Sequence, residues 1–308
     1  MKSVVFGLWL VVCFTFRALA DRPASRLVQV VVEVDPEADG TSVRESVANY
    51  SYDRGTLVGY TVEWDLTGDG VMDYRSTSMY TYDQSGNRIL NVSESTSLAD
   101  GTVQSRAEVE YTYDDQDRVI GALSKADFGG DGTVNQIEKV TLMYDSQGKL
   151  TNRVIQSDSN ADGTWDSVTT YTRTYNARGA LLSEVRETDS NLDGIADYRL
   201  SQQYALDSRD NVLSGTTTID YEADGVIDGS SRTTYTNNPH GSPMSSITEW
   251  FDADGSLGGI QTASYAYDPR GDLIQRIDRT DLNGDGVPDQ SQTTTFTYAQ
   301  SMGKNRTE

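Results

Sequence analysis

Apolar and polar residues alternate with a period of two along much of the chain. In the clearest segment Ala107, Val109, Tyr111 and Tyr113 are separated by single polar residues. This period places successive side chains on opposite faces of a β-strand. Thr-rich runs, as in residues 293–295, also favour strands, and no helical period interrupts the series. The pattern predicts an all-β protein.

Two sequence markers recur along the chain at a nearly constant interval. The first is an Asp-Gly pair, and the second is a Tyr that follows each of these aspartates at a constant offset. The aspartates are Asp39, Asp69, Asp100, Asp131, Asp162, Asp193, Asp224, Asp254 and Asp285. The second marker is Tyr52, Tyr82, Tyr113, Tyr144, Tyr175, Tyr267 and Tyr298, with Leu206 and Asn237 at the two remaining places. This regularity indicates nine repeats of one structural unit.

Each repeat is predicted to contain two strands and two turns. An Asp-x-x-Gly turn follows the Tyr, as at Asp83 to Gly86, and a second strand follows it, as at Leu150 to Ile155. The Asp-Gly loop then closes the next hairpin. About 18 strands should form one antiparallel β-meander over residues 21–300. An open sheet of this size is expected to curl or spiral.

Residues 1–20 have the features of a secretory signal peptide. Lys2 precedes an apolar run from Val4 to Phe16, and Ala18 and Ala20 form an A-x-A cleavage site. The run is short for a membrane anchor. We expect cleavage after Ala20 and export to the periplasm, the cell surface or the medium. Residues 301–308 form a polar tail.

The chain is strongly acidic, with 47 Asp and Glu against 25 Lys and Arg and a net charge of −22. This charge disfavours nucleic acid and anionic membrane surfaces as partners. Of the 47 acids, 24 lie at positions 1, 3, 5 and 9 of the nine Asp-Gly loops, counting the Asp of Asp-Gly as position 5. The acid surplus is therefore concentrated in the loops.

Five of these loops carry oxygen-bearing side chains at positions 1, 3, 5 and 9, with Gly at position 6. The sets are Asp65, Thr67, Asp69, Asp73; Asp158, Asn160, Asp162, Asp166; Asp189, Asn191, Asp193, Asp197; Asp220, Glu222, Asp224, Asp228; and Asp281, Asn283, Asp285, Asp289. Hard oxygen ligands in this number suit Ca²⁺ better than Mg²⁺. The alternative is that Asp-Gly is only a hairpin turn, which does not explain positions 1, 3 and 9. We therefore predict several calcium sites.

The four other loops depart from the full set. Two are partial, with Asp35, Glu37, Asp39 in one and Asp127, Asp131, Asn135 in the other. The loops around Asp100 and Asp254 lack most of the ligand positions, and we expect them to keep the turn without binding a cation. The five complete loops are not EF-hands, because strands flank each loop and position 12 is Ser76, Thr169, Leu200, Ser231 or Gln292 in place of Glu.

The Tyr-Asp-x-x-Gly-x-Leu pattern resembles the YD (Rhs) repeat of secreted and surface bacterial proteins. Residues 144–150 and 267–273 match it best, and the resemblance covers residues 35–300. The Asp-Gly loops are similar to the calcium loops of thrombospondin type 3 repeats and integrins. The resemblance implies a curled β-shell, which in Rhs proteins can enclose a toxin. Here the chain is short, and no toxin domain follows the repeats.

The favoured function is a secreted structural or interaction protein stiffened by Ca²⁺. Its partner is then an unidentified surface protein or glycan, with no membrane span. The alternatives are a propeller-like glycan- or protein-binding module that uses the tyrosines, a remnant of an Rhs toxin shell, and a polysaccharide-active enzyme. No acid pair stands apart from the repeats, and His240 occupies a turn, so we predict that the chain is not an enzyme.

Overall fold

The computed structural model describes residues 25–35, 44–67 and 69–300. All regular secondary structure in these ranges is β-strand, and no helix in them is long and apolar enough to cross a membrane. The strands are β1 (Ser25–Asp35), β2 (Arg44–Asp53), β3 (Thr56–Trp64), β4 (Tyr74–Tyr82), β5 (Arg88–Ser97), β6 (Val103–Tyr113), β7 (Val119–Asp127), β8 (Gln136–Tyr144), β9 (Leu150–Asp158), β10 (Ser167–Tyr175), β11 (Leu181–Asp189), β12 (Tyr198–Leu206), β13 (Val212–Asp220), β14 (Gly229–Asn237), β15 (Pro243–Asp252), β16 (Leu257–Tyr267), β17 (Leu273–Asp281) and β18 (Gln290–Gln300). The all-β antiparallel prediction is confirmed.

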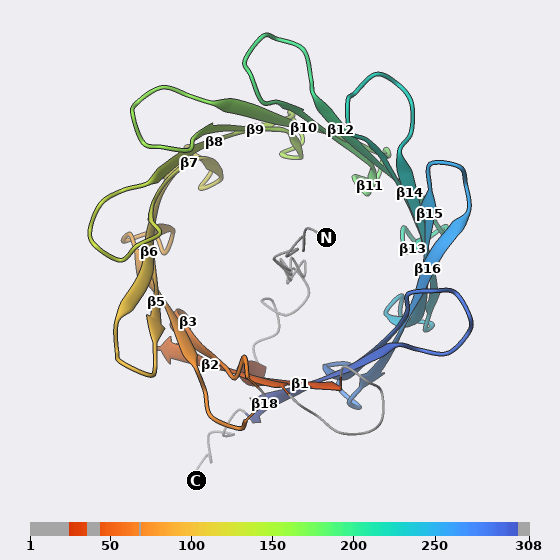
Figure 1. Cartoon of the computed structure of the whole chain (residues 1–308), viewed down its shortest axis with the longest axis horizontal. Coiled ribbons are helices and arrows are strands. Elements are labelled where there is room, and N and C mark those ends of the chain that lie inside the picture. The colour runs from red at the N-terminus through yellow and green to blue at the C-terminus, as the bar shows by residue number, and fades with distance from the viewer. Residues whose placement is uncertain (1–24, 36–43, 68, 301–308) are drawn as a thin grey trace, which may run out of the picture.

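The strands form one closed barrel (Figure 1). Each strand pairs antiparallel with the next in sequence, and β1 pairs with β18 from Ser25↔Gln300 to Asp35↔Ser291. The expectation of a curled or spiral sheet is therefore wrong. An open sheet would leave the backbone groups of β1 and β18 unpaired, and closure satisfies both edges with each other.

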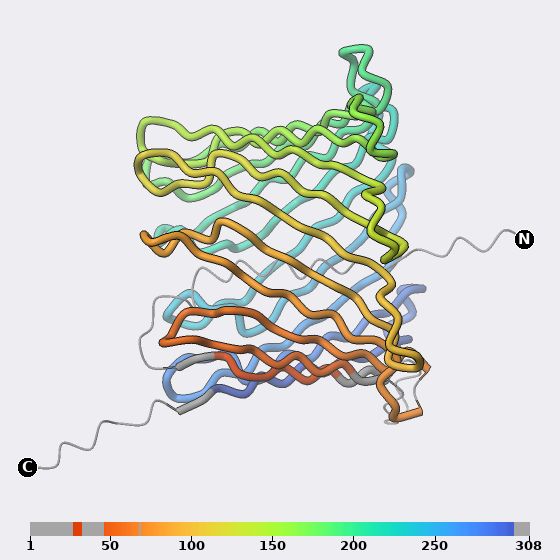
Figure 2. The backbone as a smooth tube through the Cα atoms, turned by 90° about the vertical axis from the view of Figure 1, so that its left-hand side faces the viewer, coloured from red at the N-terminus to blue at the C-terminus, as the bar shows by residue number. Residues whose placement is uncertain are grey.

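The two ends of the barrel carry the two kinds of connection. The Asp-Gly loops join each odd-numbered strand to the next strand at one end, and the Tyr-Asp turns join each even-numbered strand to the next at the other. Figure 1 shows the Asp-Gly loops spreading outward from the end nearer the viewer. In Figure 2 the strands run at a slant between the two ends, as barrel closure requires. All candidate metal loops of the described residues therefore share one rim.

Alternation along each strand separates an inner from an outer face. In β4, Tyr74, Ser78 and Tyr80 are more buried than Arg75 and Met79. Side chains converge on the concave side of a closed sheet and spread apart on its convex side, so we assign the more buried set to the interior. The interior is thus lined by Tyr and small polar residues with some charged residues such as Arg186 and Asp278, and Thr, other charged residues and scattered aliphatic residues lie outside.

The barrel has no packed hydrophobic core. Ala263 is the one apolar residue classed as fully buried in the described part of the chain. An 18-stranded barrel is too wide for its side chains to fill, so water reaches the inner face. Stability must come from the strand ladders, from cross-strand contacts and from the connections at the two ends.

Candidate metal loops and tyrosine hydrogen bonds

The aspartate at position 1 of each complete loop lies at the end of a strand and anchors the loop backbone. Its carboxylate accepts a hydrogen bond from the amide of the position-6 glycine. This bond measures 2.7 Å from Gly70 to Asp65, 2.8 Å from Gly163 to Asp158 and 2.8 Å from Gly225 to Asp220. These aspartates are only 2–3 % exposed. A buried carboxylate needs such partners, so position 1 is a structural part of the loop.

Position 9 closes the loop from its other end. The Oδ2 atoms of Asp73, Asp166 and Asp197 each accept a 2.7 Å hydrogen bond from the amide of position 2. Asp228 and Asp289 do the same at 2.6 and 2.7 Å. The position-9 carboxylate therefore holds the first turn of the loop in place.

Positions 3 and 5 form short local bonds inside the loop. The Oδ1 atoms of Asp69, Asp193 and Asp285 each accept from the amide of position 7 at 2.8 Å. Where position 3 is Asn, its Oδ1 accepts from the amide of position 5, as in the 2.9 Å bond from Asp193 to Asn191. Asp and Asn side chains commonly bond to the backbone two residues on. The loop conformation is thus fixed by its own oxygen-bearing side chains.

The hydrogen bonds keep several of these aspartates ionised. Burial raises the pKa of Asp281, but bonds from the amides of Gly286 and Gly284 more than offset it, and the pKa lies below the usual range. Asp162 has a lowered pKa because the hydroxyl and amide of Thr164 donate to it. Asp162 and Asp281 are therefore negatively charged at neutral pH.

The side-chain chemistry of the loops suits a hard cation. At positions 5 and 9 the amide bonds described above use one carboxylate oxygen, which leaves the other for a further partner. Asp162 is the exception, because its Oδ2 accepts from the side chain of Asn160 at 3.1 Å. However, no three Asp, Glu, His or Cys side chains of the described residues are grouped as in a metal site. The donor set fits Ca²⁺, and the grouping would have to form when the ion binds.

Three of the four incomplete loops are described in full, and they fold in two ways. The loop of Asp127 has Gly129 at position 3 and Asn135 at position 9, yet Gly132 donates to Asp127 at 2.6 Å and Phe128 donates to Asn135 at 2.7 Å. It therefore folds like the complete loops. The loops at Asp100 and Asp254 are shorter turns. In the first the amide of Gly101 donates to the carbonyl of Ser97, and in the second the amide of Gly255 donates to the carbonyl of Asp252.

Part of the first loop lies outside the described residues. Glu37 and Asp39 belong to that part, and only the backbone of Asp35 is described, as the end of β1. His240 lies in an exposed turn, where its amide donates to Asn238 at 2.9 Å. This agrees with the turn position inferred from the sequence.

The opposite end of the barrel contains a hydrogen bond that the sequence did not reveal. The hydroxyl of each marker Tyr donates to a backbone carbonyl of the preceding strand, as in Tyr113 to Arg88 at 2.6 Å and Tyr144 to Val119 at 2.7 Å. Asn237 replaces the Tyr and donates through Nδ2 to Val212 at 2.9 Å. The constant offset between the two markers was the available signal, but it did not identify the acceptor.

These bonds extend strand pairing beyond the end of the regular ladder. The ladder between β9 and β10 ends at the pair Thr172↔Asn152, so it does not extend to Leu150, the first residue of β9. Tyr175 then donates to Leu150 at 2.7 Å. The tyrosine hydroxyl thus gives the Leu150 carbonyl a partner in β10 beyond the last ladder pair of these two strands.

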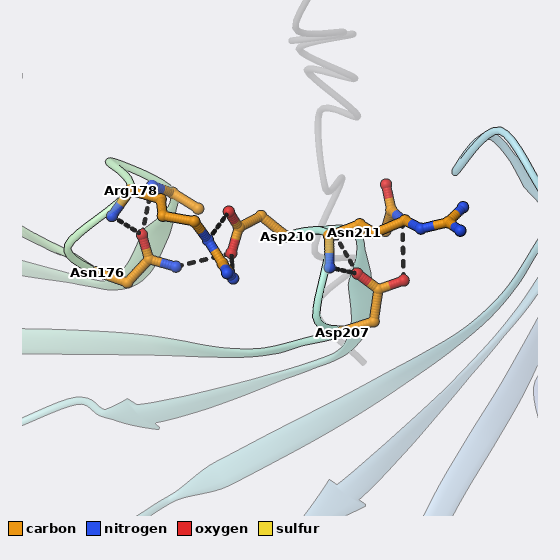
Figure 3. Close-up of polar contacts among 7 residues, drawn as sticks. Asn176, Arg178, Asp207, Asp210 and Asn211 are labelled. Carbon is orange, nitrogen blue, oxygen red and sulfur yellow. Dashed lines mark hydrogen bonds and ion pairs between the residues drawn. The ribbon is translucent and has the colours of Figure 1, made fainter.

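The Tyr-Asp turns are also linked to each other by side chains (Figure 3). Arg178 and Asn176 of one turn donate to Asp210 of the next at 2.5–2.8 Å. Within a turn, Asp207 accepts from the amide and the side chain of Asn211 at 2.9 and 2.8 Å. The carboxylates at this end therefore serve as turn caps and links.

Comparison with known proteins gives no family for the chain. No protein-family model and no curated protein matches it. Among solved structures, a porin-like protein from Bacteroides uniformis aligns with TM-score 0.46 and 14 % identity over 90 % of this chain and 98 % of its own. A porin-like protein from Bacteroides vulgatus gives TM-score 0.32 and 11 % identity over 89 % and 99 %. The Tc holotoxin pore of Photorhabdus luminescens gives 0.30 and 13 % over 82 % and 16 %. At these TM-scores the similarities do not decide fold or function.

Proposed function

We propose that the chain is a secreted β-barrel scaffold whose Asp-Gly loops bind Ca²⁺. The observation that carries the proposal is the arrangement repeated in the loops. In each, amide bonds orient the carboxylates of positions 1, 5 and 9, and those of positions 5 and 9, apart from Asp162, keep one oxygen for a further partner. Ca²⁺ accepts 6–8 oxygen ligands in flexible geometry. In this proposal the ion draws the remaining oxygens together with backbone carbonyls and water.

Ca²⁺ would then stabilise a barrel that has no hydrophobic core to do so. An ion that binds the folded loops and not the unfolded chain shifts unfolding by mass action. With Ca²⁺ near millimolar outside cells and a Kd of ~10⁻⁴ M, each site contributes about 1.4 kcal/mol. Five such sites would contribute about 7 kcal/mol, which is comparable to the whole stability of an ordinary domain.

We propose further that both faces of the wall meet water. The outer face carries charged residues away from the strand ends, including Arg106 of β6, which lies 2.8 Å from Glu108 and 3.8 Å from Glu94. An Arg or Lys facing lipid at mid-depth costs about 2–4 kcal/mol. These charges argue for a barrel that stands in solution or on a surface.

Isothermal titration of the chain from residue 21 onward tests calcium binding. We expect about five ions per chain, one for each complete loop. The variant Asp193→Asn keeps the oxygen that accepts from Ile195 and removes one charge, so it should lose one ion. Asp207→Asn changes a turn at the other end and serves as the matched control. An absence of binding heat, or equal stoichiometry in both variants, would overturn the proposal.

A further inference from the structure

Two arginines flank one tyrosine on the inner face of the barrel. Tyr171 of β10 lies directly opposite Arg153 of β9 on one side and Arg186 of β11 on the other. The guanidinium carbons lie 5.1 and 5.8 Å from the centre of the tyrosine ring. These distances are typical of cation–π contacts. All three residues belong to the alternating set that faces the interior.

The aromatic surface continues towards the Asp-Gly rim. Arg186 also lies over Tyr198 at 5.3 Å, and the ring of Tyr198 lies 6.0 Å from that of Tyr221. Tyr221 is 63 % exposed. The five side chains therefore form a strip, named here the Arg–Tyr strip, that runs from the middle of the inner wall to the rim.

The two arginines of the strip have no acidic partner among the described residues. Glu184, which shares the face of Arg186 on β11, is held by Arg173, and Glu138 accepts from Ser157 at 3.0 Å. The Nε of Arg186 is buried and has no hydrogen-bond partner in the described structure, so an external anion would meet the terminal nitrogens of this guanidinium. Lone arginines are unexpected in a chain with 22 excess negative charges. Because Glu184 and Glu138 are engaged by other residues, the strip is suited to an anion that comes from outside.

We propose that the Arg–Tyr strip binds an anionic oligosaccharide that carries carboxylates. A guanidinium stacked on a ring keeps its in-plane N–H groups for bidentate bonds to a carboxylate. Tyrosine rings next to it offer flat apolar faces for sugar rings and hydroxyls for hydrogen bonds. The concave, water-filled interior gives a chain-like ligand room to lie along the wall.

The spacing of the arginines favours a ligand with several charges. Arg153 and Arg186 are separated by two inter-strand distances, about 10 Å. An oligosaccharide with a carboxylate on every second sugar can meet both guanidiniums at once. The acidic loops at the rim do not prevent this, because charges farther apart than the Debye length of about 8 Å are largely screened at physiological salt.

Isothermal titration calorimetry with a hyaluronan octasaccharide tests the proposal. This ligand has a carboxylate on every second sugar, and the protein is the chain from residue 21 onward in calcium-containing buffer. We expect saturable binding that weakens about 10-fold or more in Arg153→Gln and in Arg186→Gln, the loss of one charge-assisted contact. Arg232→Gln removes a charge from the outer face and should leave binding unchanged. Melting curves of the three variants show whether each is folded.

Two further probes separate the oligosaccharide from simpler ligands. A neutral chitin oligosaccharide of the same length should not bind, and neither should inorganic sulfate at the same concentration. Equal binding of the neutral sugar, or binding of sulfate without binding of the octasaccharide, would overturn the proposal. So would octasaccharide binding that is the same in wild type, Arg153→Gln and Arg186→Gln.

Discussion

The hydroxyl of Tyr175 donates a 2.7 Å hydrogen bond to the carbonyl oxygen of Leu150, in the strand before it. Tyr52, Tyr82, Tyr113, Tyr144 and Tyr298 make the same connection at the same sequence separation. Each bond joins the end of one even-numbered strand to the start of the strand before it. In a barrel without a packed core, these bonds hold neighbouring turns together.

Removal of one such hydroxyl should lower stability measurably. We expect Tyr175→Phe to reduce the free energy of unfolding by about 0.5–1.5 kcal/mol, the net contribution of one hydrogen bond, as measured by urea denaturation. Tyr235→Phe is the matched control, because the Tyr235 hydroxyl makes no hydrogen bond within the described residues. Equal effects of the two substitutions would show that the bond to Leu150 is not important.

The one Leu at this marker position offers the reverse experiment. Leu206 cannot donate, so the carbonyl of Leu181, which is the equivalent acceptor position in this repeat, lacks this partner. Leu206→Tyr should raise the melting temperature, whereas Leu206→Phe, which adds the ring without the hydroxyl, should not. If Phe stabilises as much as Tyr, ring packing and not the hydrogen bond is responsible.

The buried position-1 aspartates should be far less tolerant than the exposed position-5 aspartates. Asp220 is 3 % exposed and accepts amide bonds from Gly225 and Asp224 through different oxygens. Asp220→Asn puts an NH₂ group against one of these donors and should cost about 1–3 kcal/mol. Asp224→Asn retains its acceptor for Val226 and should have a small effect. Urea denaturation in the presence of a chelator measures the unfolding free energy of both variants. Equal losses of unfolding free energy would contradict the structural role assigned to position 1.

Stability should fall in acid because several aspartates have lowered pKa values in the folded chain. A hydrogen bond from the Arg118 side chain lowers the pKa of Asp114, and one from the Asn211 side chain lowers that of Asp207. Since these pKa values lie below the unfolded value of about 3.9, the stabilisation is complete above that pH and is lost as the pH falls through the folded values. In melting curves from pH 7 to pH 2.5, the midpoint should stay constant down to about pH 4 and decline below it. A midpoint unchanged at pH 2.5 would contradict this.

The sequence predicted the strands well because their period is local. Alternation around Ala107 to Tyr113 corresponds to β6, and the segment from Leu150 corresponds to β9. Closure of the barrel was not predictable in the same way. It depends on pairing of Ser25 with Gln300, and no local pattern records whether the first and last strands meet.

The sequence located the candidate loops, but it did not predict the hydrogen bonds that their side chains make inside each loop. Ligand spacing predicts Asp65 and Asp73 to be cation ligands, whereas the structure shows them accepting hydrogen bonds from amides inside the loop. The role of the tyrosines was missed for a similar reason. Periodicity assigns Tyr82 to a face of a strand, but its bond to Leu57 depends on how adjacent strands end.

The most direct test of the calcium proposal is the thermal midpoint of the chain from residue 21 onward. It is measured in 2 mM CaCl₂ and in EDTA at equal ionic strength. We predict a clearly higher midpoint in calcium, a rise that MgCl₂ at the same concentration does not reproduce, and a smaller rise in Asp193→Asn. Identical midpoints in calcium and chelator would mean that the Asp-Gly loops are hydrogen-bonded turns and nothing more.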